Sequence, residues 1–129
     1  MLNKSMIVVS VLGGFVAFSP IASAECSLND EEFVARQSNG FTARFYNLKQ
    51  NGTKLRGDAK SGDNRGEITS GLITKSGRLK LTVDWDGDSV GIYTAHVEPD
   101  GTVTDGRTYD KTHPESWATW ETDQLSCDP

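Results

Sequence analysis

The feature that most constrains the fold of this chain is an unbroken succession of short β-prone segments that begins after Gly40. Segments rich in Thr, Val, Ile and aromatic residues alternate with turn-forming residues, which is typical of antiparallel β-proteins. Asn51-Gly52 is the clearest hairpin signal, because both residue types tolerate a positive φ. The expected strands cover about residues 41–49, 53–59, 66–74, 78–86, 89–97, 102–109 and 116–122.

The segment from Arg78 to Asp86 shows that at least one strand has a buried face. Its apolar residues alternate with polar ones, and they are Leu79, Leu81, Val83 and Trp85. Hairpins in unbroken succession place sequential strands side by side. A sheet of this many strands twists and tends to close, because closure removes exposed edges. The sequence therefore predicts a small antiparallel up-and-down β-barrel of about seven or eight strands, with a two-sheet β-sandwich as the alternative.

The segment before the first expected strand carries the helix signal of the chain. Asn29 can act as an N-cap, and residues 30–32 place three carboxylates in the first turn, where they suit the helix dipole. Asn39-Gly40 is a helix stop signal. We therefore expect a short N-terminal helix over about residues 30–38. The alternative is a short strand through Phe33 and Val34 that turns at residues 38–40.

The first 24 residues have the layout of a secretory signal peptide. Lys4 precedes an apolar run over residues 6–18, and Ala22-Ser23-Ala24 is a small-residue cleavage site. The apolar run is shorter than the about 20 residues of a membrane-spanning helix, so a membrane anchor is the less favoured interpretation. We expect cleavage after Ala24, one domain over residues 25–129, and a periplasmic or secreted location without a membrane anchor.

The two cysteines lie close to the two ends of the expected mature chain. In an oxidising compartment, Cys26 and Cys127 are expected to form a disulfide that ties these ends together. An up-and-down barrel brings its first and last strands side by side, so the expected disulfide agrees with the expected fold.

Charge is segregated along the chain. Residues 33–80 contain ten basic and three acidic residues, whereas residues 81–129 contain two basic and eleven acidic residues. The interpretation favoured here is that basic and acidic strands pair within one sheet and neutralise each other. The alternative is a two-faced molecule whose basic side meets an anionic partner. An exported acidic protein is not expected to bind nucleic acid.

The sequence contains no recognisable catalytic or metal-binding motif. It lacks a Gly-x-Ser-x-Gly elbow, a phosphate-binding Gly-rich loop and a His-Glu-x-x-His pair. Asp84, Asp86 and Asp88 alternate as in calcium-binding loops, but Gly87 occupies the fourth position and not the sixth position of an EF-hand loop. A hairpin turn explains these residues. We therefore expect no enzyme activity, no metal and no cofactor.

The late hairpins of the chain resemble those of avidin-like and other calycin-type small meander barrels; the segments that carry the resemblance are Leu81-Thr82-Val83-Asp84-Trp85, residues 90–97 and the turn at Asp100-Gly101. The resemblance implies a barrel. Tyr46 and Asn47 lie near the place of the early ligand residues of avidins. However, the following Leu48-Lys49-Gln50 does not reproduce the loop of that family, so biotin binding is not implied.

Aromatic residues are the candidate ligand-binding residues, and they are Trp85, Tyr93, Tyr109, Trp117 and Trp120. Trp117 and Trp120 have opposite parity in one expected strand, so one should face the interior and the other the solvent. An exposed Trp can stack a sugar or anchor a partner protein, whereas the alternative is that both pack in the core.

The function expected from these features is that of an exported non-enzymatic binding module. Its ligand would be a small apolar molecule or a sugar, held at the open end of the barrel or on the aromatic patch. The alternative is a protein-interaction module, such as an inhibitor of a secreted hydrolase, that presents its loops and its charged face to a partner.

Overall fold

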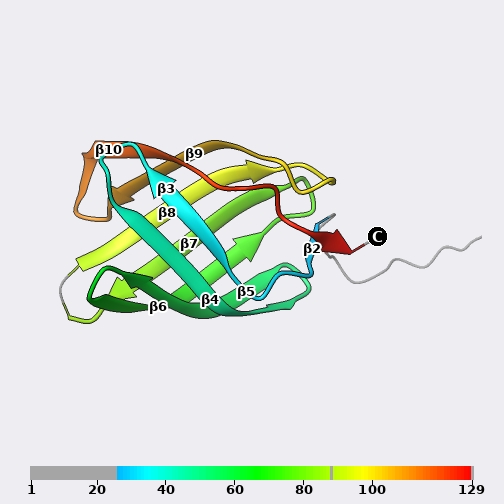
Figure 1. Ribbon diagram of the computed structural model, residues 1–129, viewed down its shortest axis with the longest axis horizontal. Helices are drawn as coiled ribbons and strands as arrows, with labels where there is room; N and C mark the ends of the chain where they lie inside the picture. The colour runs from blue at the N-terminus through cyan, green and yellow to red at the C-terminus, as the bar shows by residue number, and fades with distance from the viewer. Residues whose placement is uncertain (1–25, 88, 129) are drawn as a thin grey trace, which may run out of the picture.

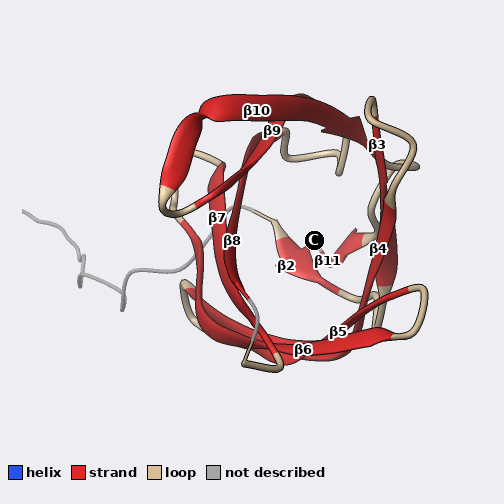
Figure 2. Ribbon diagram, turned by 90° about the vertical axis from the view of Figure 1, so that its left-hand side faces the viewer, coloured by secondary structure: helices blue, strands red, loops and turns tan. Residues whose placement is uncertain are grey.

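The computed structural model describes residues 26–87 and 89–128, and it is an antiparallel β-barrel (Figure 1, Figure 2). Eight strands close in the order β10-β3-β4-β5-β6-β7-β8-β9, and a separate two-stranded sheet pairs β11 with β2. The strands are β2 (Ser27–Leu28), β3 (Phe33–Gln37), β4 (Thr42–Asn51), β5 (Lys54–Ser61), β6 (Asn64–Ile73), β7 (Arg78–Trp85), β8 (Ser89–Val97), β9 (Val103–Asp110), β10 (His113–Glu121) and β11 (Cys127–Asp128).

The barrel expected from the sequence is confirmed, and each of the seven expected strands has its counterpart among β4 to β10. The barrel is closed and is not a two-sheet sandwich. The expected signal peptide over residues 1–24 lies outside the described residues. None of the described residues forms a helix that is long and apolar enough to cross a membrane.

The helix expected over residues 30–38 is wrong, because Phe33–Gln37 forms the eighth strand of the barrel. Phe33 and Ala35 alternate with more exposed neighbours and are 6% and 0% exposed. The strand pairs with β4 on one side and with β10 on the other, so it closes the barrel. A helix this short is marginal in water, and burial of one apolar face against the barrel outweighs its local signals.

Large side chains fill the middle of the barrel. The ring centroid of Phe45 lies 5.2 Å from that of Phe33 and 5.1 Å from that of Tyr93, and the Trp120 ring lies 6.2 Å from Tyr93. Leu81 next to them is fully buried. Eight strands enclose an interior just wide enough for such side chains. The middle of the barrel is therefore a packed core and not a ligand cavity.

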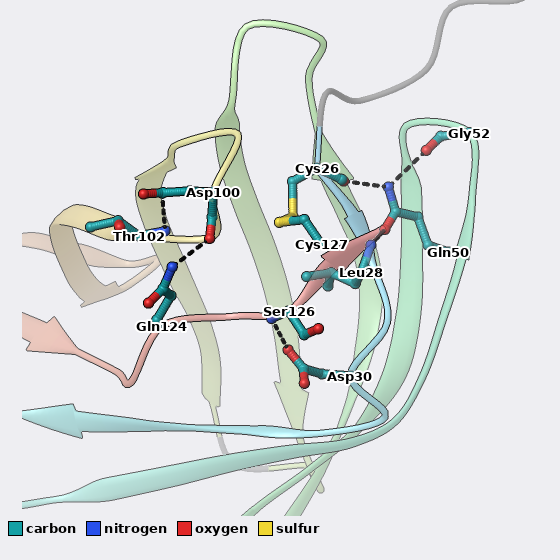
Figure 3. Close-up of a disulfide and its surroundings, with 10 residues drawn as sticks. All are labelled: Cys26, Leu28, Asp30, Gln50, Gly52, Asp100, Thr102, Gln124, Ser126 and Cys127. Carbon is teal, nitrogen blue, oxygen red and sulfur yellow. Dashed lines mark hydrogen bonds between the residues drawn. A yellow bond between two sulfur atoms is a disulfide. The ribbon is translucent and has the colours of Figure 1, made fainter. Parts of the chain in front are cut away.

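The two ends of the described chain close one end of the barrel (Figure 3). The expected disulfide is confirmed, and the Cα atoms of Cys26 and Cys127 are 4.9 Å apart. Gln50 of β4 binds β2 through its side-chain amide. Its Oε1 accepts the Leu28 N–H at 2.8 Å, and its Nε2 donates to the Cys26 carbonyl at 3.2 Å. Leu125 belongs to the same buried core as Cys26 and is 4% exposed.

The basic strands are neighbours of one another, which corrects the favoured interpretation of the charge pattern. Lys60 of β5 is the direct cross-strand partner of Arg44 on β4 and of Arg65 on β6. Lys49 and Arg56 form a further like-charge pair. The strand order around the barrel follows the order along the chain. Basic and acidic residues that are separated along the sequence are therefore also separated around the barrel wall.

Candidate functional site

The end of the barrel opposite the disulfide contains a cavity of about 290 Å³, which we call the mouth. Figure 2 looks into this end, with β2 and β11 at the far end of the barrel. The polar side of its lining consists of Gln37, Asn39, Ser89, Thr108, Asp110 and Ser116, and the remaining residues are Trp85, Gly91, Tyr93, Tyr109, Trp117 and Ala118. Ligand pockets typically start at about 300 Å³, so this volume suits a ligand built on one ring.

Trp85, at the end of β7, forms one wall of the mouth. Its direct cross-strand partner is Gly66 on β6, and Gly91 lies on β8 at the other side of the indole. A Cβ added at Gly66 would lie 2.8 Å from Trp85 Cε3, and one added at Gly91 would lie 3.0 Å from Nε1. The two glycines therefore leave the space in which the indole rests against the sheet.

Tyr93 joins the packed core to the mouth. Its ring contacts Phe45 edge to face in the core, while its hydroxyl accepts a hydrogen bond from Gln37 Nε2 at 2.8 Å. Burial raises the pKa of the Tyr93 phenol, and hydrogen bonds with Thr108 and Gln37 oppose that rise. The phenol is therefore neutral at physiological pH and acts as a fixed polar group at the inner end of the mouth.

Asp110, at the end of β9, places a carboxylate in the lining of the mouth. Its Oδ1 accepts hydrogen bonds from the Thr112 backbone N–H at 2.9 Å and from the Thr112 hydroxyl at 2.8 Å. These hydrogen bonds, with the backbone one contributing most, hold the pKa of Asp110 below its ordinary value. His113 Nδ1 lies 4.0 Å from the same Oδ1. The carboxylate is thus fixed in orientation and ionised at neutral pH.

Tyr109 and Trp117 border the mouth, but their side chains belong to the outer wall. The two residues are direct cross-strand partners next to the pair formed by Thr108 and Ala118. Successive side chains of a strand point to opposite faces, and Thr108 is buried, so Tyr109 and Trp117 point outward. Trp117 is 50% exposed, and the guanidinium carbon of Arg107 lies 4.2 Å from its ring centroid.

Trp120 is a core residue and does not line the mouth. It is 4% exposed, and its indole N–H is shared between the Thr94 carbonyl at 3.2 Å and the Arg107 carbonyl at 3.0 Å. The register of β8 against β9 shifts just after Thr94, which leaves room for this contact. The opposite parity of Trp117 and Trp120 therefore predicts their placement correctly, with Trp120 inside and Trp117 outside.

The structure brings four of the five expected aromatic residues to the rim or the lining of the mouth, but sequence reasoning missed the polar residues among them. Gln37 was hidden by the expected helix, since only a strand puts it on the same face as Phe33 and Ala35. Thr108 has the inward parity of the strand expected over residues 102–109, and that parity is the signal that could have found it. Asp110 lies one residue beyond the expected strand, which β9 extends to include.

The outer wall carries further hollows, of about 480 Å³ beside Arg78 and Lys80 and of about 520 Å³ beside Lys49 and Arg56. Asn47, which lies near the place of an early avidin ligand residue, is on this wall and donates to Asp58 Oδ2 at 3.0 Å. Within residues 26–87 and 89–128, no group of three or more His, Cys, Asp and Glu side chains is placed to hold a metal ion.

Searches against protein-family models, curated proteins and solved structures return no match for this chain.

Proposed function

We propose that this chain is an exported, non-enzymatic binding module that holds a small polar ligand, about the size of one sugar ring, in the mouth of its barrel. The observation that carries the proposal is that an aromatic wall and fixed polar groups line one cavity of about 290 Å³. An apolar ligand inside the barrel is not proposed, because Phe45, Leu81 and Tyr93 fill that space.

The lining of the mouth supports a ligand with both a flat face and hydrogen-bonding groups. Trp85 offers a partly exposed ring surface, and aromatic rings contribute large contact areas at little cost in conformational entropy. Gln37, Thr108 and Ser116 bring amide and hydroxyl groups to the same cavity. An aromatic wall beside several hydrogen-bonding groups suits a ligand that is itself polar.

The strands that carry the lining residues favour a site that is already formed before the ligand binds. Gln37, Trp85, Tyr93 and Asp110 stand on strands of a closed barrel and not on long loops. The cost of ordering the binding groups is therefore met during folding and does not weaken ligand affinity. The disulfide between Cys26 and Cys127 is typical of proteins in oxidising compartments, which supports export to the periplasm or the medium.

The test is a titration of the ¹⁵N-labelled protein with methyl glucoside and, separately, with benzyl alcohol, following the three indole N–H resonances by NMR. The Trp85 resonance is expected to shift with at least one probe, and Trp85→Ala is expected to abolish binding. Tyr46→Ala is the control, because that ring lies on the outer wall beneath the Arg44 guanidinium and does not line the mouth, and it should leave the affinity within about twofold. A Trp85 resonance that no probe moves, charged analogues of both included, contradicts the proposal.

A second candidate function, inhibition of a secreted hydrolase, is favoured by one feature of the outer wall. Trp117 is half exposed with Arg107 stacked on its ring and Tyr109 beside it, and these residue types dominate protein-interface hot spots. Inhibition of secreted glycosidases or proteases that is lost in Trp117→Ala but kept in Trp85→Ala would favour this candidate over the mouth. The reverse pattern would exclude the outer wall as the inhibitory surface.

A further inference from the structure

We infer that the mouth selects a positively charged ligand, an amine- or ammonium-bearing ring compound, and that Asp110 is the residue that determines this selectivity. The inference rests on the proposed function, because it concerns the same cavity. Among the described residues that line the mouth, Asp110 is the one that is charged at neutral pH, and none is Lys, Arg or His. The cavity therefore carries a net negative charge.

The hydrogen bonds of Asp110 leave one of its oxygens for a ligand. Asp110 pairs with Gly91 across the β8–β9 ladder, on the same inward face as Tyr93 and Thr108. Its Oδ1 is occupied by the two hydrogen bonds from Thr112. Within the described part of the chain, no hydrogen bond reaches Oδ2. The carboxylate is thus anchored through one oxygen, and the other remains free to accept from an ammonium group.

The aromatic residues of the mouth favour the same sign of ligand charge. The face of an indole or phenol ring carries negative potential, so it attracts a cation and repels an anion. Trp85 and Tyr93 line the cavity that contains Asp110. An ammonium group in this cavity meets a carboxylate and the partly exposed indole of Trp85, whereas an anion meets unfavourable potential from both.

The charge of the surrounding chain acts in the same direction. Residues 81–129, which include β8, β9 and β10, contain eleven acidic and two basic residues. Because the strand order follows the sequence, these three strands are adjacent and form the wall that carries Asp110. A surface of one sign raises the local concentration of small ligands of the opposite sign, and the effect weakens with salt.

The experiment compares probes that share a ring and differ in charge. The sugar set is methyl glucoside, methyl 6-amino-6-deoxyglucoside and methyl glucuronide; the aromatic set is benzyl alcohol, benzylamine and benzoate. Dissociation constants are measured at pH 7.5 in low salt from the shift of the Trp85 indole resonance. For the ring that binds, the amine is expected to bind about two- to fivefold more tightly than the neutral probe, the order expected for one partly exposed charge pair. The anion is expected to bind most weakly.

The decisive variant is Asp110→Asn, which keeps the Oδ1 acceptor for the Thr112 N–H and removes the charge. It is expected to abolish the preference for the amine, so that the amine and the neutral probe bind the variant with affinities within about twofold of each other. The matched control is Asp100→Asn, because Asp100 Oδ1 accepts the Thr102 N–H at 2.9 Å in the same type of turn at the other end of the barrel. This control should retain the preference.

The outcomes separate this inference from the proposed function. If the neutral probe binds and the amine binds no more tightly, or if Asp110→Asn keeps the preference for the amine, the inferred selectivity is wrong. The mouth then remains a binding site. If none of the six probes moves the Trp85 resonance, both are wrong.

Discussion

Gln37 and Tyr93 are joined across the barrel by a hydrogen bond of 2.8 Å from the amide Nε2 to the phenolic oxygen. They lie 56 residues apart in the sequence, on strands β3 and β8, which are not neighbours in the barrel. The bond therefore links two separate parts of the wall at the inner end of the mouth. Its loss should affect the stability of the barrel and the shape of the site together.

Tyr93→Phe tests this link, because it removes the hydroxyl and keeps the ring in the core. The expected loss is about 1 kcal/mol in the free energy of unfolding, the usual contribution of a partly buried hydrogen bond. Urea denaturation gives the value. Tyr109→Phe is the control, because that side chain points to the outer wall, and it should change stability by less than about 0.5 kcal/mol. Equal losses in the two variants would show that the link has no special role.

The raised pKa of Tyr93 predicts a loss of stability in alkali. Because burial favours the neutral phenol in the folded state, Tyr93 should ionise above the ordinary value of 10.0. The unfolded chain then releases its proton first, so this contribution to stability is complete below pH 10 and falls as the pH rises through the folded-state pKa. Spectrophotometric titration at 295 nm, with Tyr93→Phe as the reference, should show one late-ionising tyrosine that disappears in the variant.

Gly91→Ala should displace the indole of Trp85. The added methyl group would lie 3.0 Å from Trp85 Nε1, whereas its contact with Tyr93 Cε1 at 3.5 Å is ordinary. We expect a destabilisation of about 1–2 kcal/mol, typical of overpacking, with a change in near-UV circular dichroism. In a Trp85→Leu background the same substitution should cost much less. A cost that is identical in both backgrounds would mean that Gly91 does not make room for the indole.

Removal of the disulfide should lower the free energy of unfolding without changing the structure of the mouth. The bond spans 101 residues, a loop for which chain-entropy models give about 4–5 kcal/mol of stabilisation. The double variant Cys26→Ala, Cys127→Ala is expected to lose at least about 2 kcal/mol in urea denaturation. The Trp85 indole resonance should keep its position, because the mouth lies at the other end of the barrel. A large shift of that resonance would contradict the independence of the two ends.

The carboxylates of Asp100 and Asp110 should both titrate below an ordinary aspartate. In each, the main cause is a hydrogen bond from a backbone N–H, of Thr102 and of Thr112. Their contribution to stability is complete above the unfolded-state value of 3.8 and is lost as the pH falls below it. Carboxyl ¹³C NMR measures both values. Thr112→Val should raise the pKa of Asp110 part of the way and leave that of Asp100 unchanged.

Most of the fold can be predicted from the sequence because its turns are local. The expected hairpin lies between β4 and β5, although its turn is one residue later than expected: Gly52 begins the turn at φ 64°, and Asn51 is the last residue of β4. Arg78–Trp85 forms a strand with the expected alternation of buried and exposed residues. Each of these signals acts over a few residues, and the local conformation that it favours agrees with the strand pairing of the barrel.

The error at the N-terminal strand has a physical reason. Asp30 and Glu32 resemble the acidic first turn of a helix, but each has a distant partner. Asp30 Oδ2 accepts the Ser126 N–H at 2.7 Å, and Glu32 accepts a hydrogen bond from the Arg44 guanidinium at 2.8 Å. The chain also needs an eighth strand to close the barrel, and no local pattern contains that requirement.

The candidate site is predictable in part. Aromatic composition points to Trp85 and Tyr93, since large rings in a small domain are either core or binding groups, and Tyr93 packs in the core with its hydroxyl at the inner end of the mouth. The polar lining from Gln37 and Asp110 follows only once the register of three strands is known. A single sequence contains the parity of each strand but not the register between strands.

The disulfide has one more consequence for a protein that we propose is exported. Together with the peptide backbone between them, Cys26 and Cys127 make the barrel a covalent circle of wall strands. A protease that cuts one exposed turn, such as that at Gly62 and Asp63, opens the circle but releases no fragment. The nicked molecule consists of two polypeptides that the disulfide holds together, so a first cleavage outside the cell does not by itself separate strands that are paired.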